Sequence, residues 1–139
     1  MRQGLQACLR GTFFTNAHGF KLDCGEASAA MLVSLVRDLK PECHAVATPP
    51  PPPTAFVLCV ATMASGPQAG ARFDLGTTLI STGIAFAALT PDAQPLHLPY
   101  SVAQQVAQRS HAGLWQFADT PDPNAIILRS LQSPALPSK

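Results

Sequence analysis

One segment of the N-terminal third has apolar residues at every third or fourth position, which predicts an amphipathic helix from Gly25 to Lys40. Its apolar positions are Leu32, Leu35, Val36 and Leu39. Asp23 precedes the segment and Glu26 follows three residues later, an arrangement typical of a helix N-cap. Pro41 cannot continue a helix, so the segment should end before it.

Other segments have the period-two or continuous apolar patterns of strands. Residues 55–63 are apolar on both faces, as in a central strand, and residues 72–79 alternate, as in a half-buried one. Residues 84–89 form a third apolar segment, and glycine-containing loops separate the three, which predicts an antiparallel meander. Nearer the N-terminus, residues 9–14 and 20–24 flank a turn-forming sequence and predict a hairpin.

The C-terminal third contains a second helical pattern. Ser101 and Gln104 form an S-x-x-Q capping pattern ahead of a narrow apolar stripe, which predicts a helix from Val102 to about Ala112. Residues 125–131 follow a proline-containing turn and are rich in isoleucine and leucine, so they are predicted to form a final strand.

Five consecutive prolines divide the chain, and they should form a polyproline II rod because proline cannot donate to a helix or a sheet. The predicted units are therefore a hairpin and helix in residues 1–48, a linker at 49–53, a meander, helix and final strand in 54–131, and a disordered tail at 132–139. The rod could instead be a ligand for an aromatic groove. Because 139 residues bury a single core, we expect one cooperative domain.

These elements predict an α+β fold in which an antiparallel sheet of three to five strands carries two helices packed on one face. Composition then limits the partners. Hydrophobic residues make up 47% of the chain and charged residues only 12%, with nine Lys and Arg against eight Asp and Glu. No basic patch is available for nucleic acid, and no apolar run is long enough to span a membrane. A weakly charged, apolar-rich surface favours a protein partner or a homo-oligomer.

The four cysteines are Cys8, Cys24, Cys43 and Cys59, and they stand 16, 19 and 16 residues apart. This spacing lacks the C-x-x-C pairs of metal and redox motifs. Polar residues interrupt the first apolar residues of the chain, unlike a secretory signal. We therefore predict buried free thiols in a cytoplasmic protein, while two disulfides, in one of three connectivities, are the alternative.

Candidate chemistry is sparse. Cys43 and His44 are adjacent, and a cysteine with a histidine could form a thiolate nucleophile, or cysteines and histidines could bind zinc. Neither has a supporting spacing, and the acidic residues are explained by caps and turns, so no cofactor, metal site or catalytic residue is predicted.

The interpretation that remains is a non-enzymatic accessory or protein-binding module. A small Cys/His-dependent enzyme and a metal-binding protein are the alternatives. Large amphipathic rings near the second predicted helix, and glutamines on it, could contact a partner. The candidate contact residues are Tyr100, Gln104, Gln105, Gln108 and Trp115.

Overall fold

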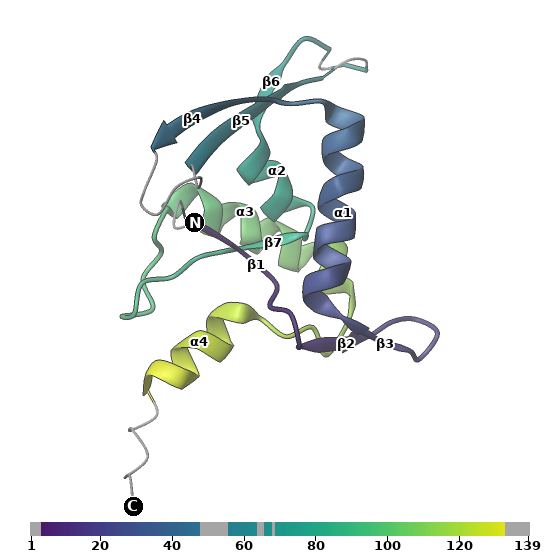
Figure 1. The fold of residues 1–139 in the computed structure, drawn as a ribbon, viewed down its shortest axis with the longest axis vertical. Coiled ribbons are helices and arrows are strands. Elements are labelled where there is room, and N and C mark those ends of the chain that lie inside the picture. The colour runs from purple at the N-terminus through teal and green to yellow at the C-terminus, as the bar shows by residue number, and fades with distance from the viewer. Residues whose placement is uncertain (1–3, 48–55, 64–65, 68, 133–139) are drawn as a thin grey trace, which may run out of the picture.

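A computed structural model describes residues 4–47, 56–63, 66–67 and 69–132, and Figure 1 shows their arrangement. Within these residues the chain forms α-helices and short antiparallel strands, so the predicted α+β class is confirmed. The expected single sheet is wrong in detail, because the strands divide among separate sheets of two, two and three strands. The proline run at 49–53 and residues 133–139 of the predicted tail lie outside the described residues.

The first half of the chain builds one long helix flanked by strands. Its elements are β1 (Leu5–Ala7), β2 (Phe13–Thr15), β3 (Lys21–Asp23), α1 (Cys24–Leu39) and β4 (Glu42–Ala47). The predicted first helix is confirmed, with bounds that differ by one residue at each end. The Asp23 side chain accepts a hydrogen bond of 3.0 Å from the Glu26 backbone N–H, as an N-cap does. Lys40 then takes a left-handed conformation with φ of 48°, which ends the helix before Pro41.

The second half contains more helix than its pattern predicts. Its elements are β5 (Phe56–Thr62), β6 (Arg72–Asp74), α2 (Leu75–Ser81), β7 (Ala85–Ala87), α3 (Leu98–Arg109), the 3₁₀-helix η1 (Gly113–Gln116) and α4 (Pro123–Gln132). The strand predicted at 72–79 is correct only as far as Asp74. There the aspartate side chain accepts the Thr77 backbone N–H at 3.0 Å and starts α2. Leu75 and Leu79 are both buried, which a helix achieves because residues four apart share a face.

The last predicted strand, residues 125–131, is wrong, because this segment forms α4. Pro123 occupies the first helical position, where its fixed φ suits a helix and its missing N–H costs nothing. The Asp122 side chain accepts the Asn124 N–H at 2.9 Å and supports the same turn. In the view of Figure 1, α4 extends away from the other helices.

Strand pairing joins distant parts of the sequence. β2 pairs with β3 as the predicted hairpin, and β5 lies between β4 and β6 in the three-stranded sheet. The third strand of the expected meander, β7, pairs instead with β1, with Gln6 opposite Phe86. The meander fails because α2 carries the chain away from β6 before β7 begins.

Two buried clusters lie on either side of β7. One is formed by α2, β7 and the inner face of α3, and it contains Leu75, Leu79, Ile80, Ala85, Ala87, Tyr100 and Ala103. The other joins the N-terminal segment to η1, and it contains Cys8, Phe14, Cys24, Phe86 and Leu114. Figure 1 shows α1 running from the β2–β3 hairpin at one end to the three-stranded sheet at the other. Its residues contribute to both clusters, so α1 connects them.

Candidate functional site

Helix α3 begins at Leu98, four residues before the predicted start, and it places the four candidate contact residues that it contains on two different faces. Tyr100 is buried, and its hydroxyl donates a 3.1 Å hydrogen bond to the Asp74 side chain at the start of α2. Burial, together with the negative charge of Asp74, raises the pKa of Tyr100 to about 12. Tyr100 therefore fastens α3 to α2 as a neutral donor.

Gln104 does not cap α3, because the helix has already begun six residues earlier. Its side-chain oxygen accepts the backbone N–H of Ala87 at 2.8 Å, which ties α3 to strand β7. Gln104 was predicted to contact a partner, but its side-chain oxygen is already engaged in this intramolecular hydrogen bond.

Trp115 lies in η1, and its ring packs edge-on against Phe86 with centroids 5.3 Å apart. Its indole Nε1 is buried and has no hydrogen-bond partner among the described residues. The side chain as a whole is only half-buried, so Trp115 lies at the margin of the second cluster.

The outward face of α3 carries a row of exposed aliphatic side chains. Leu98, Val102 and Val106 are 65%, 52% and 47% exposed, and their spacing of four residues aligns them along one side of the helix. Gln105 and Gln108 are exposed as well, and Arg109 is the one charged residue within α3. We call Leu98, Val102, Gln105 and Val106 the α3 outer row.

A second apolar surface lies on α1, where Leu32, Val33 and Val36 are exposed. Leu32 and Val36 belong to the pattern that predicted the helix, yet α1 turns Leu35 and Leu39 toward the core. The α1 surface borders exposed charged residues, including the Arg37–Asp38 ion pair at 3.2 Å. Helix α3 contains no comparable ion pair beside the α3 outer row.

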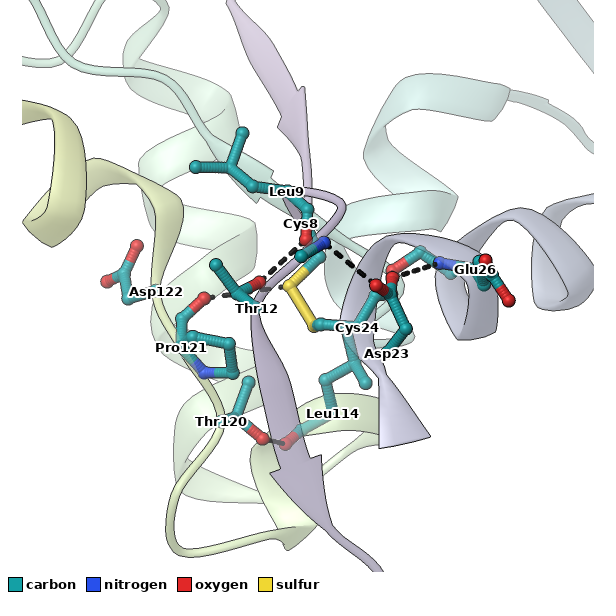
Figure 2. Close-up of a disulfide and its surroundings, with 12 residues drawn as sticks. Cys8, Leu9, Thr12, Asp23, Cys24, Glu26, Leu114, Thr120, Pro121 and Asp122 are labelled. Carbon is teal, nitrogen blue, oxygen red and sulfur yellow. Dashed lines mark hydrogen bonds between the residues drawn. A yellow bond between two sulfur atoms is a disulfide. The ribbon is translucent and has the colours of Figure 1, made fainter. Parts of the chain in front are cut away.

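The prediction of free thiols is wrong, because all four cysteines form disulfides, Cys8 with Cys24 and Cys43 with Cys59. Figure 2 shows the first bond beneath the loop that follows β1, with Leu114 and Pro121 beside it. A sulfur in a disulfide is not a thiolate, so the oxidised chain offers no cysteine nucleophile or thiolate ligand. Within the described residues, no three His, Cys, Asp or Glu side chains gather closely enough to hold a metal ion.

The most strongly held carboxylates have structural partners. Asp23 caps α1, and Asp119 accepts hydrogen bonds from the Thr15 N–H at 2.9 Å and the Thr15 hydroxyl at 2.7 Å. These bonds hold the pKa of each carboxyl below its ordinary value, since they stabilise the ionised form. Both groups are therefore suited to anchoring loops rather than to exchanging protons near neutral pH.

The helices of the described residues are each too short or too polar to cross a membrane. The chain matches no protein family, no curated protein and no solved structure. The narrow apolar stripe of the second predicted helix includes Val102 and Val106, but the sequence pattern did not identify these residues as exposed, and it did not include Leu98.

Proposed function

We propose that this chain is a non-enzymatic protein-binding module that contacts its partner through the α3 outer row. The observation that supports the proposal is the exposure of Leu98, Val102 and Val106 on one side of a single helix. Aliphatic anchors at four-residue spacing are the pattern by which an amphipathic helix enters an apolar groove. Isolated exposed aliphatic residues are ordinary on protein surfaces, whereas an aligned row is the arrangement that marks an interface.

The composition of α3 defines the chemistry of the partner. Apolar side chains and uncharged glutamines dominate its outer side, and Arg109 lies at its last turn. The matching surface should be an apolar groove or helix face of a second protein, with few charges. Because charge contributes little, raising the salt concentration should weaken binding only slightly.

The two disulfides bear on where this partner would be met. Such bonds persist mainly in oxidising environments and are rare in a reducing cytosol. They favour an oxidising compartment over the cytoplasm that the sequence pattern predicted. Interaction experiments should accordingly use non-reducing conditions.

Site-specific photo-crosslinking tests the proposal. A benzophenone amino acid replaces Gln105 within the α3 outer row or, as a control, the exposed residue Arg72 of strand β6, and the protein is irradiated in its native host. We expect an adduct of discrete mass from position 105 and none from position 72. A self-adduct would identify a second copy as the partner.

The matched variants keep the helix and change only the surface. Val102→Glu with Val106→Glu should abolish the adduct, because two charges would have to be buried in an apolar contact. Val33→Glu with Val36→Glu places the same two charges on exposed valines of α1, away from the α3 outer row, and it should leave the adduct in place. Circular dichroism verifies folding of each variant. A lack of adduct at position 105, or an adduct that survives the double substitution, contradicts the proposal.

A further inference from the structure

The two disulfides differ in their surroundings although they close loops of the same length. Each joins cysteines that are 16 residues apart in the sequence. Cys8 and Cys24 are 5% and 0% exposed and belong to the buried cluster with Phe14, Phe86 and Leu114. Cys43 is exposed and Cys59 is half-buried. Loop length therefore cannot distinguish the two bonds, whereas access of solvent can.

The position of the second disulfide explains its exposure. Cys43 and Cys59 lie directly opposite one another in the β4–β5 ladder. Strand β4 is at the edge of its sheet, since β5 is its one strand partner within the described residues. Cys59 packs against the α2 cluster, so the bond is covered mainly on that side. A reagent can reach it from the side of Cys43.

Access decides the chemistry because thiol–disulfide exchange needs direct attack of a thiolate on one sulfur. The Cys8–Cys24 bond offers no approach while the surrounding side chains stay packed. In addition, the Cys8 sulfur lies 3.6 Å from the carbonyl oxygen of Pro121, which Figure 2 shows beside the disulfide. Reduction of that bond therefore requires local opening of the fold, and reduction of the other does not.

We propose that Cys43–Cys59 is a thiol-exchange site that reacts with external thiols while the protein stays folded and Cys8–Cys24 stays intact. The substrate class is a small thiol or the dithiol of a second molecule. Its thiolate attacks Cys43 Sγ and forms a mixed disulfide, and the electron pair of the broken S–S bond leaves on Cys59 Sγ, which takes a proton from solvent. With a dithiol, the second thiolate attacks its own sulfur in the mixed disulfide and releases Cys43.

The net reaction transfers two electrons from the dithiol to the protein, and the reagent is left as a disulfide. Opening the bond removes the covalent link between β4 and β5. The edge strand then depends on its backbone ladder and on an exposed ion pair of 3.8 Å between Glu42 and Arg72, which contributes little. Reduction should therefore loosen β4 and leave the clusters around α2 and η1 packed.

Graded reduction of the folded protein tests the site. The protein is exposed to dithiothreitol, quenched by alkylation at successive times and analysed by peptide mass spectrometry. We expect Cys43 and Cys59 to be alkylated at least about tenfold faster than Cys8 and Cys24, because access limits exchange. Equal rates, or earlier labelling of Cys8 and Cys24, would overturn the proposal.

Reduced glutathione tests the direction of attack, since a single thiol stops more often at the mixed disulfide. The glutathione adduct should be found on Cys43, and an adduct mainly on Cys59 contradicts the assigned attack.

Hydrogen exchange should accelerate in β4 and β5 after reduction but not around Phe86 or Leu114. A variant with Cys43→Ala and Cys59→Ala should show the same accelerated exchange without reductant, and unchanged exchange in β4 would remove the claim that this bond secures the strand.

Discussion

Helices α1 and α2 start from the same local signal, yet different parts of the molecule hold them. Residues 21–25 and 72–76 both read as a basic residue, an apolar residue, aspartate, an apolar residue and glycine. In each case the aspartate ends a strand and accepts the backbone N–H three residues later, at 3.0 Å. The repeated pattern therefore specifies the same strand-to-helix junction twice.

The two junctions differ in what packs against the glycine. At α1, a Cβ on Gly25 would lie 2.7 Å from the backbone nitrogen of Arg10, and the Gly11 N–H donates to Asp23 at 2.8 Å. Cys24 fixes the same segment covalently through Cys8. At α2, a Cβ on Gly76 would overlap the hydroxyl of Tyr100, which donates to Asp74.

One junction is thus held by a cross-linked backbone segment and the other by a single buried side chain. The local sequence determines the start of a helix, and the tertiary contact determines how firmly that start is held. Substitutions at the two junctions should separate these contributions.

Removing the covalent link at α1 should have the largest effect. Cys8→Ala with Cys24→Ala is expected to lower the free energy of unfolding by about 3 kcal/mol, the usual contribution of a loop of this length, with an added cost for the buried space left by the sulfurs. Urea denaturation without reductant measures the loss. Cys43→Ala with Cys59→Ala is the matched control, since its loop is equally long and its sulfurs are less buried. An equal or larger loss in the control would contradict the role given to burial.

Substitutions at the two glycines should differ in whether their stability losses add to those of a substitution at the contacting residue. Gly76→Ala is expected to cost about 1–3 kcal/mol, because a methyl group forces the Tyr100 ring from its packed position. Adding Tyr100→Phe removes the overlapping hydroxyl, so the double variant should lose less stability than the sum of the two single changes. Gly25→Ala with Arg10→Ala should be closer to additive, because Arg10→Ala removes Cγ but leaves the backbone N and Cα of residue 10 within 2.9 Å of the new methyl group. Additivity at Gly76 would show that the hydroxyl does not limit the space.

The smallest expected changes in the free energy of unfolding come from the titration of two side chains, one at alkaline pH and one at acid pH. Burial and the Asp74 charge raise the pKa of Tyr100 to about 12, so its contribution to stability is complete below the ordinary value of 10.0 and is lost as the pH rises toward 12. The pKa of Asp23 is lowered mainly by its bond from the Glu26 N–H, so its contribution is lost as the pH falls below the ordinary value of 3.8.

Urea midpoints measured across both ranges check the assignment. Tyr100→Phe should flatten the alkaline limb alone, and Asp23→Asn the acid limb alone. A steep alkaline limb in Tyr100→Phe would point to another group.

The fold was predictable where several local sequence signals indicate the same element. Residues 24–39 combine a cap, a long apolar period and a following proline, and these agree on one helix. Residues 72–79 show a short alternation and residues 125–131 a short apolar run, and over so few residues helix and strand patterns are hard to distinguish. Their caps at Asp74 and Asp122 were the available signals.

The candidate surface was only partly predictable, because α3 has apolar residues on both sides. Tyr100, Ala103 and Ala107 pack inward, whereas Val102 and Val106 point outward, and both sets satisfy helical spacing. Which of the two faces of α3 is buried depends on how α2 and β7 pack against it, and the sequence of α3 alone does not contain this information. The pairing of the cysteines was likewise not predictable, because it depends on which cysteines the tertiary fold brings together. Partner contact at the five candidate residues stays a prediction.

Two side-chain amides form hydrogen bonds to the backbone of strand β7 on the side away from β1. Gln104 accepts the N–H of Ala87, and Asn124 donates to the Ala87 carbonyl at 2.6 Å and accepts the Leu89 N–H at 3.3 Å. Carboxamides thus occupy the backbone groups to which a foreign strand would otherwise bind. At Ala87 the outer edge of this small sheet is therefore closed to a further strand, because both backbone groups of that residue are already bonded.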